Sequence, residues 1–426
     1  MTVQKAKADA LAARLAVGVP GQGGWLGAAR AAAVARLEGM GLPGKRDEYW
    51  RYTDPSTLNA VEAPKADLFD SRGEARPFSS LDRLKIVFVD GVLDAAQSDD
   101  LTLDGVEITR LGTAPDAHWG ADLYGVLEAR GQSPVARPFA ALNTALATEG
   151  VLIRVTGKPS KPISLIYLRT SEGSDAMLHH CVKVESGADL TLLENGPGAA
   201  RLNKVLEVEV ADGGRFHHIR TQGRDHQRRA VTHIFARIGA EALFKSFTLT
   251  ANGRLTRNEA FIELLGADSV AHIAGASMGD GDFHHDDTVF VTHAAERCES
   301  RQVFKKVLKN GALGVFQGKI LVKPGAQKTD GYQISQSLLL DEDSQFLAKP
   351  ELEIYADDVK CSHGSTSGAI DDTALYYLRS RGVPLKQAQS LLVLAFLAEA
   401  IAEIEDETIA EDIRGRLEAW LHRHEH

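Results

Sequence analysis

The residues best suited to chemistry lie in one short segment, 357–368 (DDVKCSHGSTSG). Cys361 and His363 are two residues apart, so in an extended chain both side chains face the same way. A thiolate beside an imidazole suits iron, zinc or an iron–sulfur cluster in formation, but two ligands do not complete a site. The remaining ligands would have to come from across an interface. The alternative interpretation is an ordinary turn.

Histidine is the other residue type that could bind metal. The chain has fifteen, and six occur as adjacent pairs: His179-His180, His217-His218 and His284-His285. Adjacent residues of a strand point to opposite faces, so each pair can send at most one imidazole inward. The densest ligand-type segment is 281–287 (GDFHHDD), where Asp286 and Asp287 follow a pair. For most of these histidines we expect ordinary hydrogen-bonded roles.

Charge and cysteine content exclude several classes of protein. Lys and Arg number 48 against 58 Asp and Glu, a net charge of −10 that disfavours binding to nucleic acid or anionic lipid. Three cysteines cannot form a disulfide framework or a four-cysteine metal site within one chain. We see no signal peptide, and the most apolar run, 391–398, is far shorter than the roughly 20 residues of a bilayer span. We therefore expect a cytoplasmic protein.

No complete catalytic motif is present. The nearest approach to a P-loop, 39–46 (GMGLPGKR), lacks the Ser or Thr that holds magnesium and follows a helix instead of a strand. The G-x-S-x-G, H-E-x-x-H and C-x-x-C patterns are absent. If the work of this protein consumes ATP, another chain must bind the nucleotide.

The chain divides into three regions by its periodicity. Residues 1–150 are helical or mixed: a glycine-rich break at 18–24 separates two helices, residues 85–93 (KIVFVDGVL) read as a strand and turn, and 139–148 as a short helix. Strand patterns dominate 151–370. Residues 371–426 return to helix, with Asp371 as an N-cap, Gly382 as a stop and Pro384 at the next helix start.

A repeat runs through the strand-rich region. Gly187, Gly213, Gly239 and Gly266 each precede a short strand pattern, at intervals of 26, 26 and 27 residues. Gly311 follows 45 residues later, which we interpret as two shorter intervals. Such a period is typical of a solenoid, and alternating runs such as 204–210 (KVLEVEV) favour a parallel β-helix. A β-sandwich with evenly spaced turns is the alternative.

The C-terminal helices have an apolar surface larger than a solenoid edge needs. Residues 385–404 are apolar nearly all round, which suggests burial against a partner or in a helical bundle. The acidic residues that follow, from Glu399 to Asp412, are interpreted as a solvated face.

Several segments together resemble one known family. Residues 352–382, which contain the Cys-Ser-His-Gly run and end in 377–382 (YLRSRG), are similar to the C-terminal signature of the SufB/SufD family of iron–sulfur cluster assembly proteins. Residues 289–308 and 318–336 resemble the core of that family. The segment 47–53 (DEYWRYT), the chain length and the few cysteines resemble its SufD-like branch. The resemblance covers most of the chain, from about residue 45 to 405.

The resemblance implies a mainly β fold, a right-handed parallel β-helix core flanked by helical regions. It implies a non-catalytic scaffold that pairs with a SufB-like paralogue and binds a SufC-like ABC ATPase on its C-terminal helices. His363, with Cys361 beside it, would be the metal- or cluster-facing residue, and a nascent iron–sulfur cluster would be shared with the paralogue instead of bound stably here. The implied ATPase docking residues are Leu375, Tyr376, Leu378, Arg379, Leu391, Leu394 and Phe396.

Two other classes stay open from the residues alone. One is a β-helix polysaccharide lyase or hydrolase using Asp286 and Asp287, which the lack of a secretion signal argues against. The other is a homodimeric metal-binding protein in which two copies of Cys361 and His363 supply four ligands. A homodimer of the isolated scaffold is also compatible with the exposed β-helix edges. Cys298 has no motif that assigns it a role.

Overall fold

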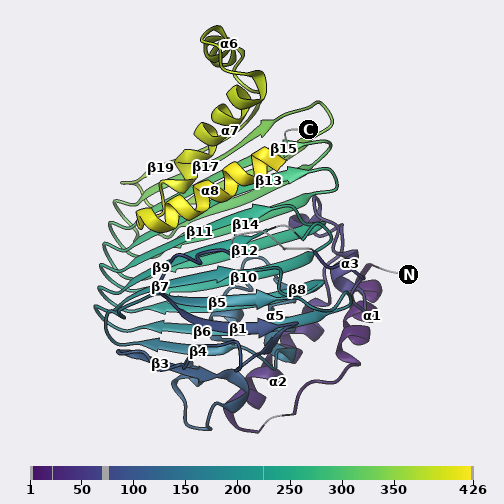
Figure 1. The fold of residues 1–426 in the computed structure, drawn as a ribbon. Coiled ribbons are helices and arrows are strands. Elements are labelled where there is room, and N and C mark those ends of the chain that lie inside the picture. Colours follow the sequence, from purple (N-terminus) through teal and green to yellow (C-terminus); the bar gives the residue numbers. More distant parts are fainter. Residues whose placement is uncertain (1–2, 22, 70–75, 224, 424–426) are drawn as a thin grey trace.

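The computed structural model describes residues 3–21, 23–69, 76–223 and 225–423, which form a parallel β-solenoid with helices at both ends of the chain (Figure 1). The helices are α1 (Val3–Leu15), α2 (Gly24–Met40), α3 (Ser56–Asn59), α4 (Val126–Arg130), α5 (Pro138–Leu146), α6 (Asp372–Ser380), α7 (Leu385–Ile401) and α8 (Glu407–Arg423), with 3-10 turns η1 (Glu48–Trp50), η2 (Leu111–Thr113) and η3 (Trp119–Asp122). The mainly β fold and flanking helices are confirmed.

The strands alternate between two sheets, so each pair of successive strands makes one turn of the solenoid. Sheet A has the order β19-β17-β15-β13-β11-β9-β7-β5-β1-β2, and sheet B the order β18-β16-β14-β12-β10-β8-β6-β4-β3. The first strands are β1 (Leu84–Val89), β2 (Val92–Leu93), β3 (Val106–Arg110), β4 (Val151–Val155), β5 (Ile163–Leu168), β6 (Asp175–Val184), β7 (Asp189–Asn195), β8 (Arg201–Val210), β9 (Arg215–Gln222) and β10 (Arg229–Ile238). The others are β11 (Leu243–Ala251), β12 (Leu255–Leu264), β13 (Val270–Asp280), β14 (His284–His293), β15 (Glu299–Lys309), β16 (Leu313–Val322), β17 (Asp330–Leu339), β18 (Gln345–Ile354) and β19 (Lys360–Gly368).

The glycine repeat marks the turns into sheet A. Gly187, Gly213, Gly239 and Gly266 precede β7, β9, β11 and β13, as the sequence predicts. The interpretation of Gly311 is wrong, because this residue precedes β16 of sheet B. Its 45-residue interval therefore contains about one and a half turns. The turns also lengthen along the chain: Asp175 pairs with Arg201, 26 residues on, whereas Leu313 pairs with Gln345, 32 residues on.

The apolar core lies between the two sheets. Inward-facing residues such as Val182, Val208, Ile238, Ile262 and Val291 are buried and stack on their equivalents in the next turn. The core begins before residue 151, because β1 pairs in parallel with β5 and β3 pairs antiparallel with β4.

The N-terminal helices cover the outer face of sheet B. Every residue of α5 is buried, and α5 packs on β6, β8 and β10. Buried polar contacts fix this region to the sheet: Thr53 donates a hydrogen bond of 2.6 Å to Asp286, and Arg257, which pairs with Asp286 at 2.5 Å, donates one of 2.8 Å to the backbone carbonyl of Tyr49. The outer face of sheet B is therefore buried over most of β8, β10, β12 and β14.

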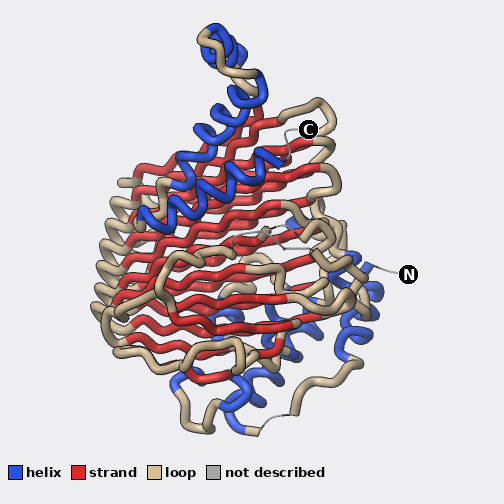
Figure 2. Tube along the Cα trace, in the orientation of Figure 1, coloured by secondary structure: helices blue, strands red, loops and turns tan. Residues whose placement is uncertain are grey.

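Two of the C-terminal helices, α7 and α8, lie across the outer face of sheet A (Figure 2). Val393 and Leu397 of α7 and Ile413 and Leu417 of α8 pack with Val303 and Val307 of β15. The acidic residues at the junction of α7 and α8 do not form only a solvated face, which corrects the sequence interpretation. Glu399 pairs with Lys305, Glu403 with His272 and Arg301, and Glu405 with Lys245.

Candidate functional site

The last turn of the solenoid is open. β18 and β19 are the terminal strands of sheets B and A, and each pairs with a described strand on one side only, β16 and β17. We call these two strands the open end. Their residues are exposed or half-buried, whereas those of β14 and β15 are mostly buried. Backbone N–H and C=O groups along such an edge are available to another strand.

Cys361 and His363 lie on the face of β19 that continues the interior of the solenoid. Cys361 is in register with Gly331 and His363 with buried Gln333. A Cβ atom on Gly331 would lie 3.2 Å from the Cys361 Sγ atom, so this glycine gives the thiol its room. The prediction that both side chains face the same way is confirmed, because β19 is a regular strand.

The two residues differ in their surroundings. Cys361 is half-buried against an apolar cluster that includes Ile320 and Leu352, and His363 is exposed. Burial raises the pKa of the Cys361 thiol, the carboxylate of Asp330 adds to that effect, and a backbone hydrogen bond from Gly331 opposes it. Among the described residues no third histidine, cysteine or carboxylate ligand atom gathers with these two.

A longer polar column, which we did not predict from the sequence, continues on the same face of β19. Ser365 and Ser367 follow at the same alternation as Cys361 and His363, and their hydroxyls bond those of Ser335 at 3.0 Å and Ser337 at 2.8 Å. The period of two in CSHGSTS was the available signal. Opposite this column, β18 presents half-buried apolar residues, including Phe346 and Leu352.

The predicted docking residues divide between an exposed and a half-buried set. α6 has no buried residue, although its N-cap Asp371 accepts bonds from the backbone N–H groups of Thr373 and Ala374 as predicted. Tyr376 is 75% and Leu391 44% exposed, and Arg379 is also exposed, whereas Leu375 and Leu378 are half-buried. Leu394 and Phe396 pack toward sheet A. In Figure 1, α6 projects beyond the solenoid.

A second group of metal-ligand residues is internal. The ligand atoms of His179, Cys181 and Glu207 lie within 4.8 Å of one another under the N-terminal region. Glu207 already accepts bonds from His179 at 2.8 Å and from the backbone N–H groups of Gly125 and Glu128 at 2.6 and 2.7 Å. In the described part of the chain the Nδ1 atom of His179 has no hydrogen-bond partner, whereas a metal-ligating histidine normally donates a hydrogen bond through its second ring nitrogen. The three side chains therefore form a structural hydrogen-bond network.

The paired histidines and aspartates are structural as well. His180, His218 and His285 point between the sheets, and their partners His179, His217 and His284 point outward, as predicted. Asp286 and Asp287 lie on opposite faces of β14, and both are buried and paired with cations. Cys298 is buried in a turn, with its thiol 3.2 Å from the Ser269 hydroxyl. None of these carboxylates is placed to attack a polymer.

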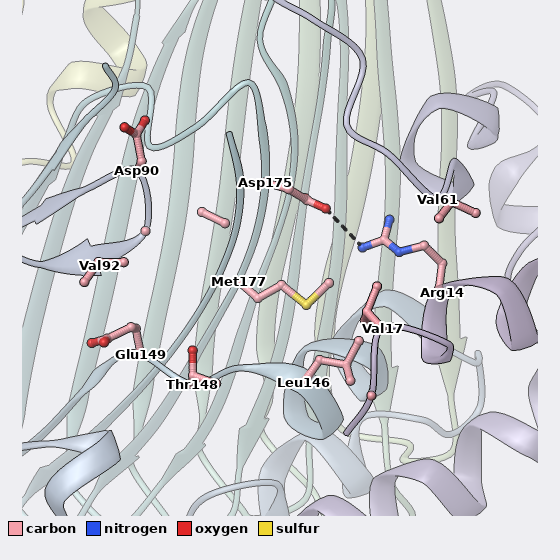
Figure 3. A pocket seen from close by; sticks show the side chains of 13 residues that line it. Arg14, Val17, Val61, Asp90, Val92, Leu146, Thr148, Glu149, Asp175 and Met177 are labelled. Atoms are coloured by element: carbon pink, nitrogen blue, oxygen red, sulfur yellow. Dashed lines mark ion pairs between the residues drawn. The ribbon is translucent and has the colours of Figure 1, made fainter. Parts of the chain in front are cut away.

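A cavity of about 300 Å³ lies at the other end of the solenoid, between α1 and the strand β6 (Figure 3). Arg14 and Asp175 approach within 3.8 Å across it. The other two acidic groups, Asp90 and Glu149, are bonded to Thr170 and Arg110. Each charged side chain on the described wall therefore already has a hydrogen-bond or ion-pair partner.

The described helices include none with the length and apolar character needed to cross a bilayer. The features that stand out are therefore a solenoid with one open end, a Cys–His pair on its inner face and a projecting helix. They define a parallel β-solenoid protein with one edge open to further strand pairing.

Comparisons with known proteins agree. The model of the SUF system FeS cluster assembly family, SufBD core domain, matches residues 167–396. SufD of Escherichia coli is 28% identical over 400 residues, 90% of each chain, and SufD of Bacillus subtilis is 26% identical over 410 residues, 91% of this chain and 92% of the relative. A SufBD family protein of Synechocystis is 27% identical over 88% of this chain and 86% of its own. The chain belongs to the SufBD family of iron–sulfur cluster assembly proteins.

Proposed function

We propose that this chain is a non-catalytic scaffold subunit that pairs with a SufB-like paralogue through the open end and binds a SufC-like ABC ATPase through α6 and α7. The iron–sulfur cluster is the cargo assembled at the junction with the paralogue. The observation that carries this proposal is the open end, with two strands of ten and nine residues that lack a partner on one side within the described chain.

The chemistry of the open end supports pairing with another solenoid. A partner strand in register with β19 would continue the interior, so the face that bears Cys361 and His363 would become enclosed. Enclosure strengthens metal–ligand and hydrogen-bond interactions by excluding water. Two ligands from this chain leave coordination positions for the paralogue, as an assembly site requires. Ile354 and Tyr355 beside β18, 40% and 57% exposed, are apolar surface for the same interface.

The exposed helix α6 supports the ATPase dock. A nine-residue helix without buried residues is marginal in isolation, so its apolar side chains need a partner. Tyr376, Tyr377 and Leu391 are large apolar residues at least 44% exposed on α6 and α7. Aromatic residues of this kind are common at the centres of protein interfaces. The sequence has no P-loop of its own, so nucleotide hydrolysis is assigned to the docked subunit.

The test is anaerobic size-exclusion chromatography with light scattering, on this chain mixed with the SufB-like and SufC-like proteins of its organism. We expect one complex with all three chains. L391D should lose the ATPase but keep the paralogue, and L265D, at an apolar residue 39% exposed on a solenoid turn, should keep both. Elution of this chain alone, at concentrations where the other two associate, would overturn the proposal.

The role of His363 has a separate test. H363A should leave the complex intact and lower the yield of iron–sulfur cluster, measured by iron and sulfide content and by visible absorbance. S362A, at the neighbouring residue on the opposite face of β19, should retain the yield. Equal yields for both variants would remove His363 from the assembly site, and C361A then tests the thiol in the same assay.

The isolated chain is expected to form a homodimer through the same edges. Light scattering on the chain alone measures this, and I354K, which adds a charge to the edge strand, should shift the mass toward the monomer. Metal analysis of the same sample separates the scaffold from a homodimeric metal-binding protein, because only the latter holds metal without the other subunits.

A further inference from the structure

The space between the two sheets contains charged side chains as well as the apolar core. Lys204 of β8 bonds Glu194 of β7, and Lys306 of β15 lies 2.6 Å from Asp287 of β14. Each contact joins sheet A to sheet B, so all four side chains point inward. Each cation in these two pairs has an anion beside it.

Arg220 of β9 is a third inward cation and has no such partner. Its Nη1 atom donates to the Thr232 hydroxyl of β10 at 2.9 Å, which fixes its direction across the interior. The residue is 4% exposed, and its Nε atom has no hydrogen-bond partner among the described residues. Within the described ranges, no carboxylate oxygen lies within the 4.0 Å of an ion pair with this guanidinium.

The nearby carboxylate of Glu194 already accepts hydrogen bonds from three other side chains. It accepts bonds from Tyr167 at 2.8 Å, from His218 at 2.9 Å and from Lys204. Burial is the largest influence on His218 and lowers its pKa, so that this imidazole is neutral near pH 7 and does not change the balance. Glu194 therefore forms its ion pair with Lys204, and Arg220 feels this carboxylate only at longer range, without an ion pair of its own.

The other inward carboxylate is also occupied. Asp287 accepts from Lys306 and lies 3.3 Å from His285, whose pKa is likewise lowered by burial. Three cations thus face two anions on the inward surface of the described strands. Arg228, buried beside Thr256, adds a further positive charge next to the interior, and its nearest carboxylate is paired with another arginine.

There is room beside Arg220. Thr248 is its register neighbour on β11 and also faces inward, yet it is 9% exposed, and inward-facing Asn258 and Ala260 are 7% and 8% exposed. Such residual surface inside a solenoid requires a space of at least the size of a water molecule. In the part of the chain that the structure describes, the Thr248 hydroxyl has no hydrogen-bond partner, so it can donate into this space, as can the Nε–H group of Arg220.

We propose that a small monovalent anion of the size of chloride binds between the sheets, beside the guanidinium of Arg220 and the hydroxyl of Thr248. A buried charge is strongly unfavourable unless it is paired. A water molecule would satisfy the donors but would leave the excess positive charge in a low-dielectric interior. The site is independent of the proposed scaffold function, and either can fail without the other.

Long-wavelength anomalous diffraction from crystals of the full chain, purified in chloride, tests the site directly. We expect a peak within hydrogen-bond distance of Arg220 Nε and Thr248 Oγ1, comparable in height to the peaks of the buried Cys181 and Cys298 sulfur atoms. The same data from R220M should lack it. Density at the level of water, or chloride peaks confined to the outer surface, would overturn the proposal.

A solution measurement gives an independent readout. The melting temperature of the wild type should be higher in sodium chloride than in sodium gluconate of equal ionic strength, because gluconate is too large for the space. T248V should reduce the difference and R220M abolish it, whereas R297M, at an exposed arginine paired with Asp268, should retain it. If R220M does not fold, the melting temperatures of T248V and the wild type in the two salts test the proposal. Equal melting temperatures of the wild type in the two salts would contradict an anion bound only by the folded state.

Discussion

The junction between α7 and α8 offers a sharp test of how the C-terminal helices are held on the solenoid. Glu403 lies in this junction, with Oε2 2.8 Å from His272 Nδ1 on β13 and Oε1 2.7 Å from Arg301 Nε on β15. The substitution Glu403→Gln keeps the size of the side chain and removes its charge. The helices should then open from sheet A more often while the solenoid stays folded.

The magnitude follows from exposure. Glu403 and His272 are 13% and 14% exposed at the side chain, so their hydrogen bond is sheltered and worth about 1.5 kcal/mol. Arg301 is 37% exposed, and solvent screening reduces its contribution to about 0.5 kcal/mol. The charge removal should therefore cost about 2 kcal/mol of local opening free energy, which is roughly a 30-fold change in the opening equilibrium.

Hydrogen exchange measured by mass spectrometry reports this equilibrium. Amides of α8 and of the second half of α7 should exchange about 30-fold faster in E403Q, and those of β6–β12 should be unchanged. E418Q is the matched control, because Glu418 lies on α8 but is exposed and makes no side-chain hydrogen bond or ion pair among the described residues. If exchange in α8 of E403Q stays within twofold of E418Q, the salt-bridged junction does not hold the helices.

Three further perturbations probe the fold. Burial alone would raise the pKa of Glu403, but the hydrogen bonds and charges of His272 and Arg301 outweigh burial, so the pKa in the folded protein lies below the ordinary 4.5. The amides of α8 in the wild type should therefore be fully protected from exchange above pH 4.5 and lose protection as the pH falls below it, and E403Q should show a smaller change. D286A removes the carboxylate that lies 2.5 Å from buried Arg257 and should lower the free energy of unfolding, measured in urea, by about 3 kcal/mol. A decrease of less than about 1 kcal/mol would contradict a stabilising ion pair under the N-terminal region. G196A places a Cβ atom 1.9 Å from a backbone carbonyl oxygen, at a residue whose φ is +113°, and should abolish soluble expression or lower the free energy of unfolding by more than about 3 kcal/mol. G157A is the control, because a Cβ atom there meets nothing within 4 Å, and equal behaviour of the two variants would refute the steric argument.

Much of the solenoid was predictable because residues close together in the sequence determine its repeat. The glycine turns before β7, β9, β11 and β13 and the alternation within each strand are properties of neighbouring residues. Gly311 was misassigned because the sequence does not tell which sheet a turn leads to, and because the later turns are longer. The role of Glu403 and Glu405 was missed for a related reason: their basic partners are more than 100 residues away, so only the fold brings them together.

The candidate site was predictable in its residues but not in its setting. The spacing of Cys361 and His363 places them on one face of any strand. The sequence does not show that β19 is the last strand of its sheet, or that serines continue the polar column on its inner face. Both features depend on the pairing of all earlier turns. The buried state of His179 was also beyond local reasoning, because the N-terminal region covers the outer face of sheet B.

The two ends of the solenoid are built differently, and this asymmetry bears on the proposed scaffold. The first end is closed by antiparallel strands: β2, of two residues, pairs with β1, and β3, of five, pairs with β4. Short, reversed strands at an edge are a common protection against further pairing. The last end has parallel strands of ten and nine residues and no such device except Pro350 within β18. The helices α7 and α8 lie instead on the face of sheet A, so within the described residues one full-length edge stays uncovered, which supports the proposed pairing with a second solenoid.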